Sequence, residues 1–262
     1  MLSILLIVAA AAPAIVDRVI DVNGVAIHLR CGGERRAGQP LVVLEAGAFN
    51  SADTWRDVHS PTAEFARVCA YDRPGRGTSP TVKGEFTPTE YIQLIRGLLQ
   101  RAGEAPPYAI VGHSMGGLIA MHYATLHPPE VAAMVLVDSS HQDQMRRFNA
   151  LPPPPAGSAP KPSPAMAAMP PEPVSFLSLI EALQKQPWRG DIPLIVLSRG
   201  KPNPTTDANA AARDVIWTEL QRDLATRSRK SELIVGKNSG HYVHNDEPHL
   251  VIEAVRRVVT SR

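Results

Sequence analysis

The chain has 262 residues, of which 44% are hydrophobic and 20% are charged, and its formal net charge is +2. This composition excludes a wholly disordered or fibrous chain, and the length suits one large domain or two small ones. A charge so near balance, with no long basic run, speaks against nucleic-acid binding, and two cysteines without C-x-x-C spacing speak against a metal cluster.

The chain begins with an apolar run. Residues 2–16 carry no charge, and the run is shorter than the roughly 20 residues that a membrane-spanning helix needs. Ala12, Pro13 and Ala14 have the small-x-small form of a cleavage site. We therefore expect residues 1–14 to be a signal peptide, and the protein to be secreted or periplasmic with no stable membrane span. A signal peptide usually has a basic residue before its apolar run, and no Lys or Arg precedes this one. The alternatives are that the run is an apolar first strand or an uncleaved anchor. The alternative location is the cytoplasm.

Short apolar runs alternate with helix-like stretches along the rest of the chain. Strands are predicted over residues 25–30, 41–44, 67–71, 108–112, 133–137, 194–197 and 232–235. Helices are predicted over residues 91–99, 117–126, 209–226 and 249–259. Continuous apolar runs of this length are typical of strands buried on both faces of a parallel sheet. The alternation therefore predicts an α/β fold, with a mostly parallel central sheet flanked by helices, over residues 15–262.

Cys31 and Cys69 both lie in predicted strands. A cysteine in such a segment is usually a small buried hydrophobe, so we expect two buried thiols. A disulfide is the alternative if the protein is exported.

The alternation stops between residues 139 and 191. Prolines crowd this segment and break any long helix, and a loop of this length is often a lid or a functional insertion. The segment also holds apolar side chains that suit a pocket roof, namely Met145, Phe148, Met166, Met169, Phe176 and Leu177. We expect a small proline-rich cap here, and a disordered excursion is the alternative.

The strongest chemical signal is at residues 112–117, which read GHSMGG. The segment satisfies G-x-S-x-G between a predicted strand and a predicted helix, which is the context that a nucleophile elbow needs. Glycines two residues before and after Ser114 let the chain turn sharply and let the helix pack closely. The Ser114 hydroxyl then projects above the sheet at a helix N-terminus, which favours developing negative charge.

A serine hydroxyl needs a base to act as a nucleophile. His241 is the best candidate, because it follows the last predicted strand and precedes the last predicted helix. The side chain of His113 should point away from that of Ser114, and His244 is expected at the surface or in the pocket lining.

Together these segments resemble the α/β-hydrolase superfamily, in its esterase and lipase-like branch. The matching segments are residues 41–47, 71–79, 112–117 and 240–248. They span nearly all of the chain after the leader, and the elbow and the Gly-His loop are the most specific of them. The resemblance implies a triad in the order serine, acid, histidine.

The resemblance leaves two main positions for the acid. Many family members carry it in the loop after the strand that precedes the histidine strand, but Asn203 stands at that point here and Asp207 lies farther along. Other members carry it at the end of the preceding strand, where this chain has Asp138. We expect Asp138 to orient His241, with Asp207 as the alternative acid and Asp143 as a third choice.

The resemblance also implies an oxyanion hole made of two backbone N–H groups. The first belongs to Met115, the residue after the nucleophile. Aligning Gly47 with the family glycine makes Ala48 the second donor. The family commonly has His-Gly here, whereas this chain has Ala46 before the glycine, and Glu45 is expected to pair with Arg73.

The predicted function is therefore hydrolysis of carboxylic esters by a serine enzyme that forms an acyl-enzyme and uses no cofactor or metal. The partner is a small-molecule ester. Ser114 stands where haloalkane dehalogenases and epoxide hydrolases have aspartate. A thioesterase, a lactonase or an aminopeptidase of the same fold remains open, and so does a non-catalytic binding protein with this fold.

Overall fold

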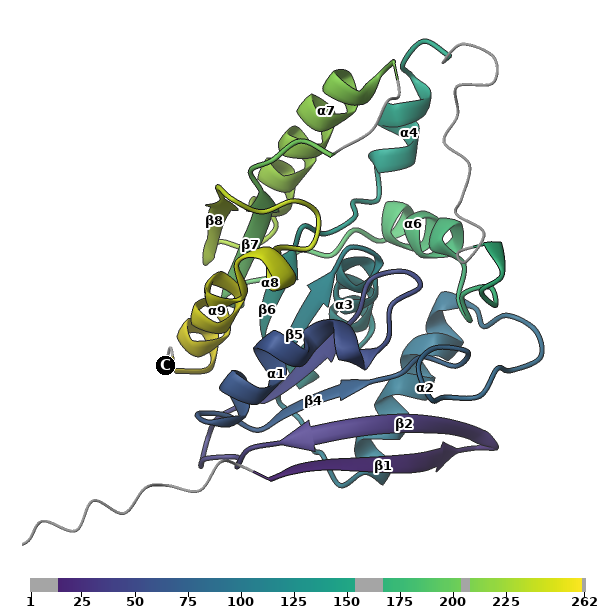
Figure 1. Cartoon of the computed structure of the whole chain (residues 1–262), viewed down its shortest axis with the longest axis vertical. Helices are drawn as coiled ribbons and strands as arrows, with labels where there is room; N and C mark the ends of the chain where they lie inside the picture. The colour runs from purple at the N-terminus through teal and green to yellow at the C-terminus, as the bar shows by residue number, and fades with distance from the viewer. Residues whose placement is uncertain (1–13, 154–166, 204–207, 261–262) are drawn as a thin grey trace, which may run out of the picture.

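The structure is a computed structural model that describes residues 14–153, 167–203 and 208–260. Its centre is an eight-stranded sheet in the order β1-β2-β4-β3-β5-β6-β7-β8 (Figure 1). The strands are β1 (Ile15–Val22), β2 (Val25–Gly32), β3 (Leu41–Glu45), β4 (Val68–Tyr71), β5 (Tyr108–His113), β6 (Val131–Val137), β7 (Leu194–Arg199) and β8 (Ser231–Gly236). The β1–β2 and β2–β4 pairs are antiparallel, and every pair from β4 to β8 is parallel.

Helices cover both faces of this sheet. They are α1 (Arg56–Ala63), α2 (Pro88–Arg101), α3 (Met115–Leu126), α4 (Gln144–Asn149), α6 (Phe176–Lys185), α7 (Ala210–Leu224), α8 (Val243–Asp246) and α9 (Pro248–Thr260), with short 3-10 turns at Ala52–Trp55 and Pro128–Glu130. Val43 packs in one core cluster with α2 and α3, and its neighbour Leu44 packs in a second cluster with α1 and α9. Alternate residues of one strand thus face opposite helical layers, which confirms the predicted α/β fold.

The burial of the strands follows their place in the sheet. Every residue of β3, β4 and β5 is buried, as expected for central strands. The same expectation is wrong for β8, where Val235 is 49% exposed. Among the described residues, β8 is an edge strand and has a neighbouring strand only on the β7 side, and its residues are mostly only partly buried.

Helix α2 shows how local sequence sets an element. Thr87 caps it, with the Thr87 side chain accepting from the Glu90 N–H and the Glu90 side chain accepting from the Thr87 N–H. Pro88 occupies the first helical position, where the lack of an N–H costs nothing. This reciprocal cap starts the helix three residues before the predicted apolar stripe begins.

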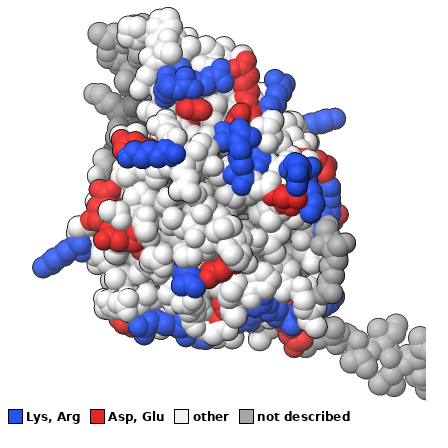
Figure 2. All heavy atoms as spheres, turned by 180° about the vertical axis from the view of Figure 1, so that it is seen from behind, with Lys and Arg blue, Asp and Glu red and all other residues white. Residues whose placement is uncertain are grey.

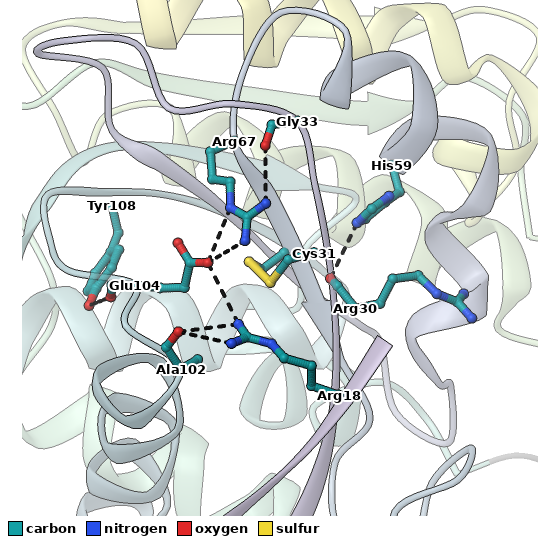
Figure 3. Close-up of a disulfide and its surroundings, with 10 residues drawn as sticks. Arg18, Arg30, Cys31, Gly33, His59, Arg67, Ala102, Glu104 and Tyr108 are labelled. Atoms are coloured by element: carbon teal, nitrogen blue, oxygen red, sulfur yellow. Dashed lines mark hydrogen bonds and ion pairs between the residues drawn. A yellow bond between two sulfur atoms is a disulfide. The ribbon is translucent and has the colours of Figure 1, made fainter. Parts of the chain in front are cut away.

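The two cysteines are joined. β2 and β4 pair with Cys31 directly opposite Cys69, and the disulfide spans Cα atoms that are 4.1 Å apart. The prediction of two buried thiols is therefore wrong, because the antiparallel register brings the residues face to face. Figure 3 shows Glu104 beside this disulfide, where it pairs with Arg67 at 2.6 Å and Arg18 at 3.9 Å.

We expect the disulfide to stabilise the fold. Its cysteines are separated by 38 residues. Closing a loop of that size lowers the entropy of the unfolded chain, which raises the free energy of unfolding by about 3–4 kcal/mol. The double variant Cys31→Ala/Cys69→Ala should lose about that much free energy of unfolding in urea titrations. The control is dithiothreitol, which should destabilise the wild type and leave the double variant unchanged. A variant as stable as the oxidised wild type would contradict this expectation.

The described part of the segment between β6 and β7 lies over one end of the sheet (Figure 1). It contains α4 and α6, and α6 packs against α3. Val174 forms a bridge to Phe86, and the Phe86 N–H donates to the Pro173 carbonyl at 2.8 Å. Met166 of the expected cap lies outside the described residues, as do residues 1–13 of the expected signal peptide. Ile15, directly after that expected peptide, begins β1.

The surface carries charges of both signs. On the face shown in Figure 2, Lys and Arg side chains lie next to Asp and Glu side chains around a largely uncharged area. Among the described residues, no helix combines the length and the apolar character needed to cross a membrane.

Candidate active site

Ser114 occupies the turn between a strand and a helix. β5 ends at His113 and α3 begins at Met115. The backbone of Ser114 has φ +51° and ψ −118°, a conformation that costs roughly 1–3 kcal/mol for a residue with a side chain. The Ser114 N–H donates to the Val137 carbonyl at 3.2 Å, and its carbonyl accepts from the Ser140 N–H at 3.0 Å. The start of the next loop thus holds the turn.

Two glycines let α3 approach the sheet. A Cβ on Gly116 would lie 2.4 Å from the carbonyl oxygen of Glu45, and a Cβ on Gly112 would lie 2.5 Å from that of Gly116. Contacts this short do not occur for real side chains, so both positions require glycine. The close approach that we inferred from the motif brings the N-terminus of α3 next to the end of β3.

Asp138 follows the end of β6, which pairs with β5. Its side chain is fully buried and accepts from His241 Nδ1 at 2.7 Å, Trp217 Nε1 at 2.8 Å, Arg199 Nη1 at 3.0 Å and the Arg199 N–H at 3.1 Å. Burial alone would raise the pKa of Asp138, but the His241 hydrogen bond and the Arg199 charge outweigh burial and hold that pKa below its usual range. Asp138 is therefore an ionised carboxylate.

His241 lies in the loop between β8 and α8. Because its Nδ1 faces Asp138, its Nε2 is the ring nitrogen left to contact another group. His241 and Ser114 line the same cavity. Two hydrogen bonds fix the loop just before His241. The Ser239 carbonyl accepts from the Lys201 N–H at 2.9 Å, and the Gly240 N–H donates to Asp246 Oδ2 at 2.7 Å.

A buried histidine pair supports this loop. His113 Nε2 contacts the His241 carbonyl at 2.9 Å. Burial, with the nearby His244 and His241, keeps the pKa of His113 well below its ordinary value, so a neutral ring donates this bond. His244 Nε2 lies 3.0 Å from Thr54 Oγ1. The expectation that His244 lies at the surface or in the pocket lining is wrong: it is 0% exposed, because α8 turns it inward against Trp55.

The other acid candidates lie elsewhere or cannot be placed. Asp207 lies outside the described residues. Asp143 stands at the N-terminus of α4, and its carboxylate pairs with Arg146 at 3.3 Å. Asn203 lines the cavity, and its N–H donates to Asp214 at 3.3 Å. Among the described residues, Asp138 is the carboxylate that contacts the His241 ring.

The loop after β3 reaches the same cavity. Ala48 and Met115, the residues whose N–H groups we expect in an oxyanion hole, both line it with Ser114. The expected pair of Glu45 and Arg73 is present, with Arg73 Nη1 at 2.9 Å from Glu45 Oε1. Burial raises the pKa of Glu45, and Arg73 and the Tyr71 hydroxyl oppose that rise. The loop after β3 is thus supported by the buried ion pair of Glu45 and Arg73, next to Ala46, which stands where the family commonly has histidine.

The cavity beside Ser114 has a volume of about 770 Å³. Aromatic side chains from several segments contribute to its wall, namely Phe49, Phe148, Phe176 and Trp217. Charged side chains also reach it, namely Glu85, Glu172, Arg199, Arg213 and Asp214. A largely apolar chamber with a few charged groups is the form that binding sites for small organic molecules take.

Three residues at the site escaped the sequence analysis. Arg199 and Trp217 bind the Asp138 carboxylate from β7 and α7. Glu172 binds Arg73 and Arg76 from the segment before α6. The position of Arg199 two residues after a predicted strand is a usable signal, whereas nothing near Trp217 or Glu172 in the sequence points to the site.

Outside this cavity, one group among the described residues has the spacing of a metal site. It consists of Cys31, Cys69 and Glu104. The two sulfurs are bonded to each other and Glu104 is paired with Arg67, so these groups are engaged with other partners.

Known proteins resemble this chain over all or part of its length. The profile of the Alpha/beta hydrolase family matches residues 41–254. The uncharacterized protein YqjL of Bacillus subtilis is 29% identical over 242 residues, covering 91% of this chain and 90% of that protein. The putative carbamate hydrolase RutD of Escherichia coli O157:H7 is 32% identical over 103 residues, covering 39% of this chain and 38% of that protein.

Solved structures share the fold at low identity. Cfl2 from Burkholderia cenocepacia superposes with a TM-score of 0.70 at 18% identity, covering 96% of this chain and 98% of that chain. A thermophilic esterase from Thermogutta terrifontis superposes with a TM-score of 0.67 at 19% identity, covering 94% of this chain and 100% of that chain. At these identities the likeness concerns the fold alone.

Proposed function

Because the chain belongs to the alpha/beta hydrolase family, we propose that it is a serine hydrolase that cleaves carboxylic esters through an acyl-enzyme. One observation carries the proposal: His241 Nδ1 lies 2.7 Å from the buried Asp138 carboxylate, and His241 shares a cavity with the strained Ser114. Family membership alone supports hydrolase chemistry, and this arrangement supports a serine nucleophile.

The proposed reaction uses each group in turn. Ser114 Oγ attacks the ester carbonyl while His241 Nε2 accepts its proton, and Asp138 stabilises the resulting imidazolium. The N–H groups of Ala48 and Met115 bind the negative oxygen of the tetrahedral intermediate. The intermediate collapses, His241 returns the proton to the departing alcohol, and water then releases the acid from Ser114 by the same steps.

We also propose that residues 139–191 form a cap that sets substrate size. Phe148 and Phe176 belong to this segment and line the cavity. A chain-length series of p-nitrophenyl esters tests both proposals. We expect the wild type to turn these esters over, and Phe148→Ala and Phe176→Ala to change the ratio of short- to medium-chain hydrolysis several-fold, because apolar side chains set pocket size.

The series separates the two ideas. An unchanged ratio in both variants would contradict the cap, although the wild type remains an esterase. No turnover of any ester, together with no labelling by a fluorophosphonate, would instead favour a binding protein with this fold.

The disulfide supports a location outside the cytoplasm. Cys31 and Cys69 are bonded, and such bonds persist mainly in oxidising compartments. We therefore propose that the protein is secreted or periplasmic.

A further inference from the structure

A buried carboxylate from the segment before α6 contacts the loop after β3. The Glu172 side chain is 8% exposed, and its Oε1 accepts from the Phe49 N–H at 2.5 Å. Phe49 directly follows Ala48, and its φ is +62°, a region that few residues other than glycine adopt. The contact therefore holds a strained peptide next to the amide that we propose as an oxyanion donor.

The same carboxylate is bound by two arginines of the loop after β4. Arg73 Nε lies 2.9 Å from Glu172 Oε2, and Arg76 Nε lies 3.0 Å from Oε1. Arg73 also donates to the carbonyls of Ala46 at 2.8 Å and Gly47 at 2.5 Å. One guanidinium thus ties Glu172 to the two peptides that precede Ala48.

The charges of this cluster balance. Glu45 and Glu172 face Arg73 and Arg76, and all four side chains are at least nine-tenths buried. Burial would raise the pKa of Glu172, but Arg73, the Phe49 N–H and Arg76 outweigh it and lower that pKa. Loss of Glu172 would leave two buried cations facing one anion and would remove the acceptor of the Phe49 N–H.

The position of Glu172 argues against a direct chemical role. Its oxygens accept from the Phe49 N–H, Arg73 Nε, Arg73 Nη2 and Arg76 Nε. A carboxylate with four donors is poorly suited to take a proton from water. It lines the cavity together with Ala48 and Phe49, so its contacts act on the shape of the loop.

We propose that Glu172 is a positioning residue for ester cleavage, which holds the Ala48 N–H in line with the developing oxyanion. This inference rests on the serine hydrolase function proposed above. Through Glu172, the described part of the segment between β6 and β7 would support the oxyanion site as well as line the pocket.

The test compares Glu172→Ala and Glu172→Gln with Glu181→Gln, a control on the exposed side of α6. Full loss of one oxyanion donor lowers kcat by about 10²–10³-fold. A displaced donor should cost less, so we expect Glu172→Ala to lower kcat for p-nitrophenyl acetate roughly 10–100-fold, with KM within about threefold. Affinity for a trifluoromethyl ketone, which forms an oxyanion at the serine, should fall in parallel. Glu172→Gln should recover part of the loss, because its amide oxygen still accepts from the Phe49 N–H.

Amide hydrogen exchange of residues 46–50 gives a readout that needs no turnover. We expect faster exchange in Glu172→Ala and wild-type exchange in Glu181→Gln. Unchanged exchange, or a kcat within twofold of the wild type, would overturn the inference. If Glu172→Ala does not fold, Glu172→Gln carries the comparison, with a smaller fall in kcat and a smaller rise in exchange than expected for Glu172→Ala but both beyond the wild-type values. A wild type that hydrolyses no ester would instead overturn the proposed function, while the exchange data still report on the Glu172 contact.

Discussion

Ser114→Ala should abolish ester turnover and leave the fold intact. The substitution removes the hydroxyl that we propose forms the acyl bond, and loss of a catalytic serine typically lowers kcat by at least about 10⁴-fold. Ser114 is half-buried at a turn whose hydrogen bonds come from backbone atoms, and alanine keeps those bonds. We therefore expect a thermal midpoint within roughly 2 °C of the wild type. Steady-state kinetics with p-nitrophenyl acetate measures the first effect, and calorimetry measures the second.

Residual activity decides the assignment. A rate within about tenfold of the wild type would show that Ser114 is not the nucleophile. The matched control is Ser140→Ala, because Ser140 lines the same cavity from the neighbouring loop. Its loss should change kcat far less than the loss of Ser114.

Asp138→Asn should lower kcat on the order of 10³–10⁴-fold. The amide cannot stabilise the imidazolium, and its NH₂ group favours the wrong tautomer of His241. The substitution also removes a charge that faces Arg199 at 3.0 Å in the protein interior. Breaking such a pair destabilises a protein by roughly 3 kcal/mol or more, so kinetics should be measured well below the unfolding midpoint of the variant.

Two controls locate the acid. Asp207→Asn and Asp143→Asn should have little effect on kcat, since Asp138 binds His241 Nδ1 and Asp143 pairs with Arg146. The reverse pattern, with Asp207→Asn crippling and Asp138→Asn mild, would move the acid to the later loop.

The parts of the fold that could be predicted depend on local signals. The turn at Ser114 needs glycines at fixed offsets between an apolar run and a helix, and that pattern lies within a few residues. α2 begins at a reciprocal cap between Thr87 and Glu90 and carries an apolar stripe. By contrast, α1 escaped prediction because its eight residues are mostly polar and include Pro61, although Val58 and Ala63 are buried.

The parts that could not be predicted depend on contacts between distant segments. Glu172 lies 123 residues from Phe49 along the chain, and Arg199 lies 61 residues from Asp138. Cys31 and Cys69 meet because β2 pairs with β4 and bypasses β3 in the sheet. Strand order and register decide such contacts, and no pattern within one segment carries that information.

We propose Ser114 as the nucleophile of an acyl-transfer site. The most direct measurement is peptide mass spectrometry after treatment with a fluorophosphonate, with Ser114→Ala as the control. We expect one adduct per chain, on the peptide that contains Ser114, at a rate that parallels the loss of ester turnover, and no adduct in Ser114→Ala. An unmodified Ser114 in a protein that has lost its ester turnover, or equal labelling of Ser114→Ala, would contradict it.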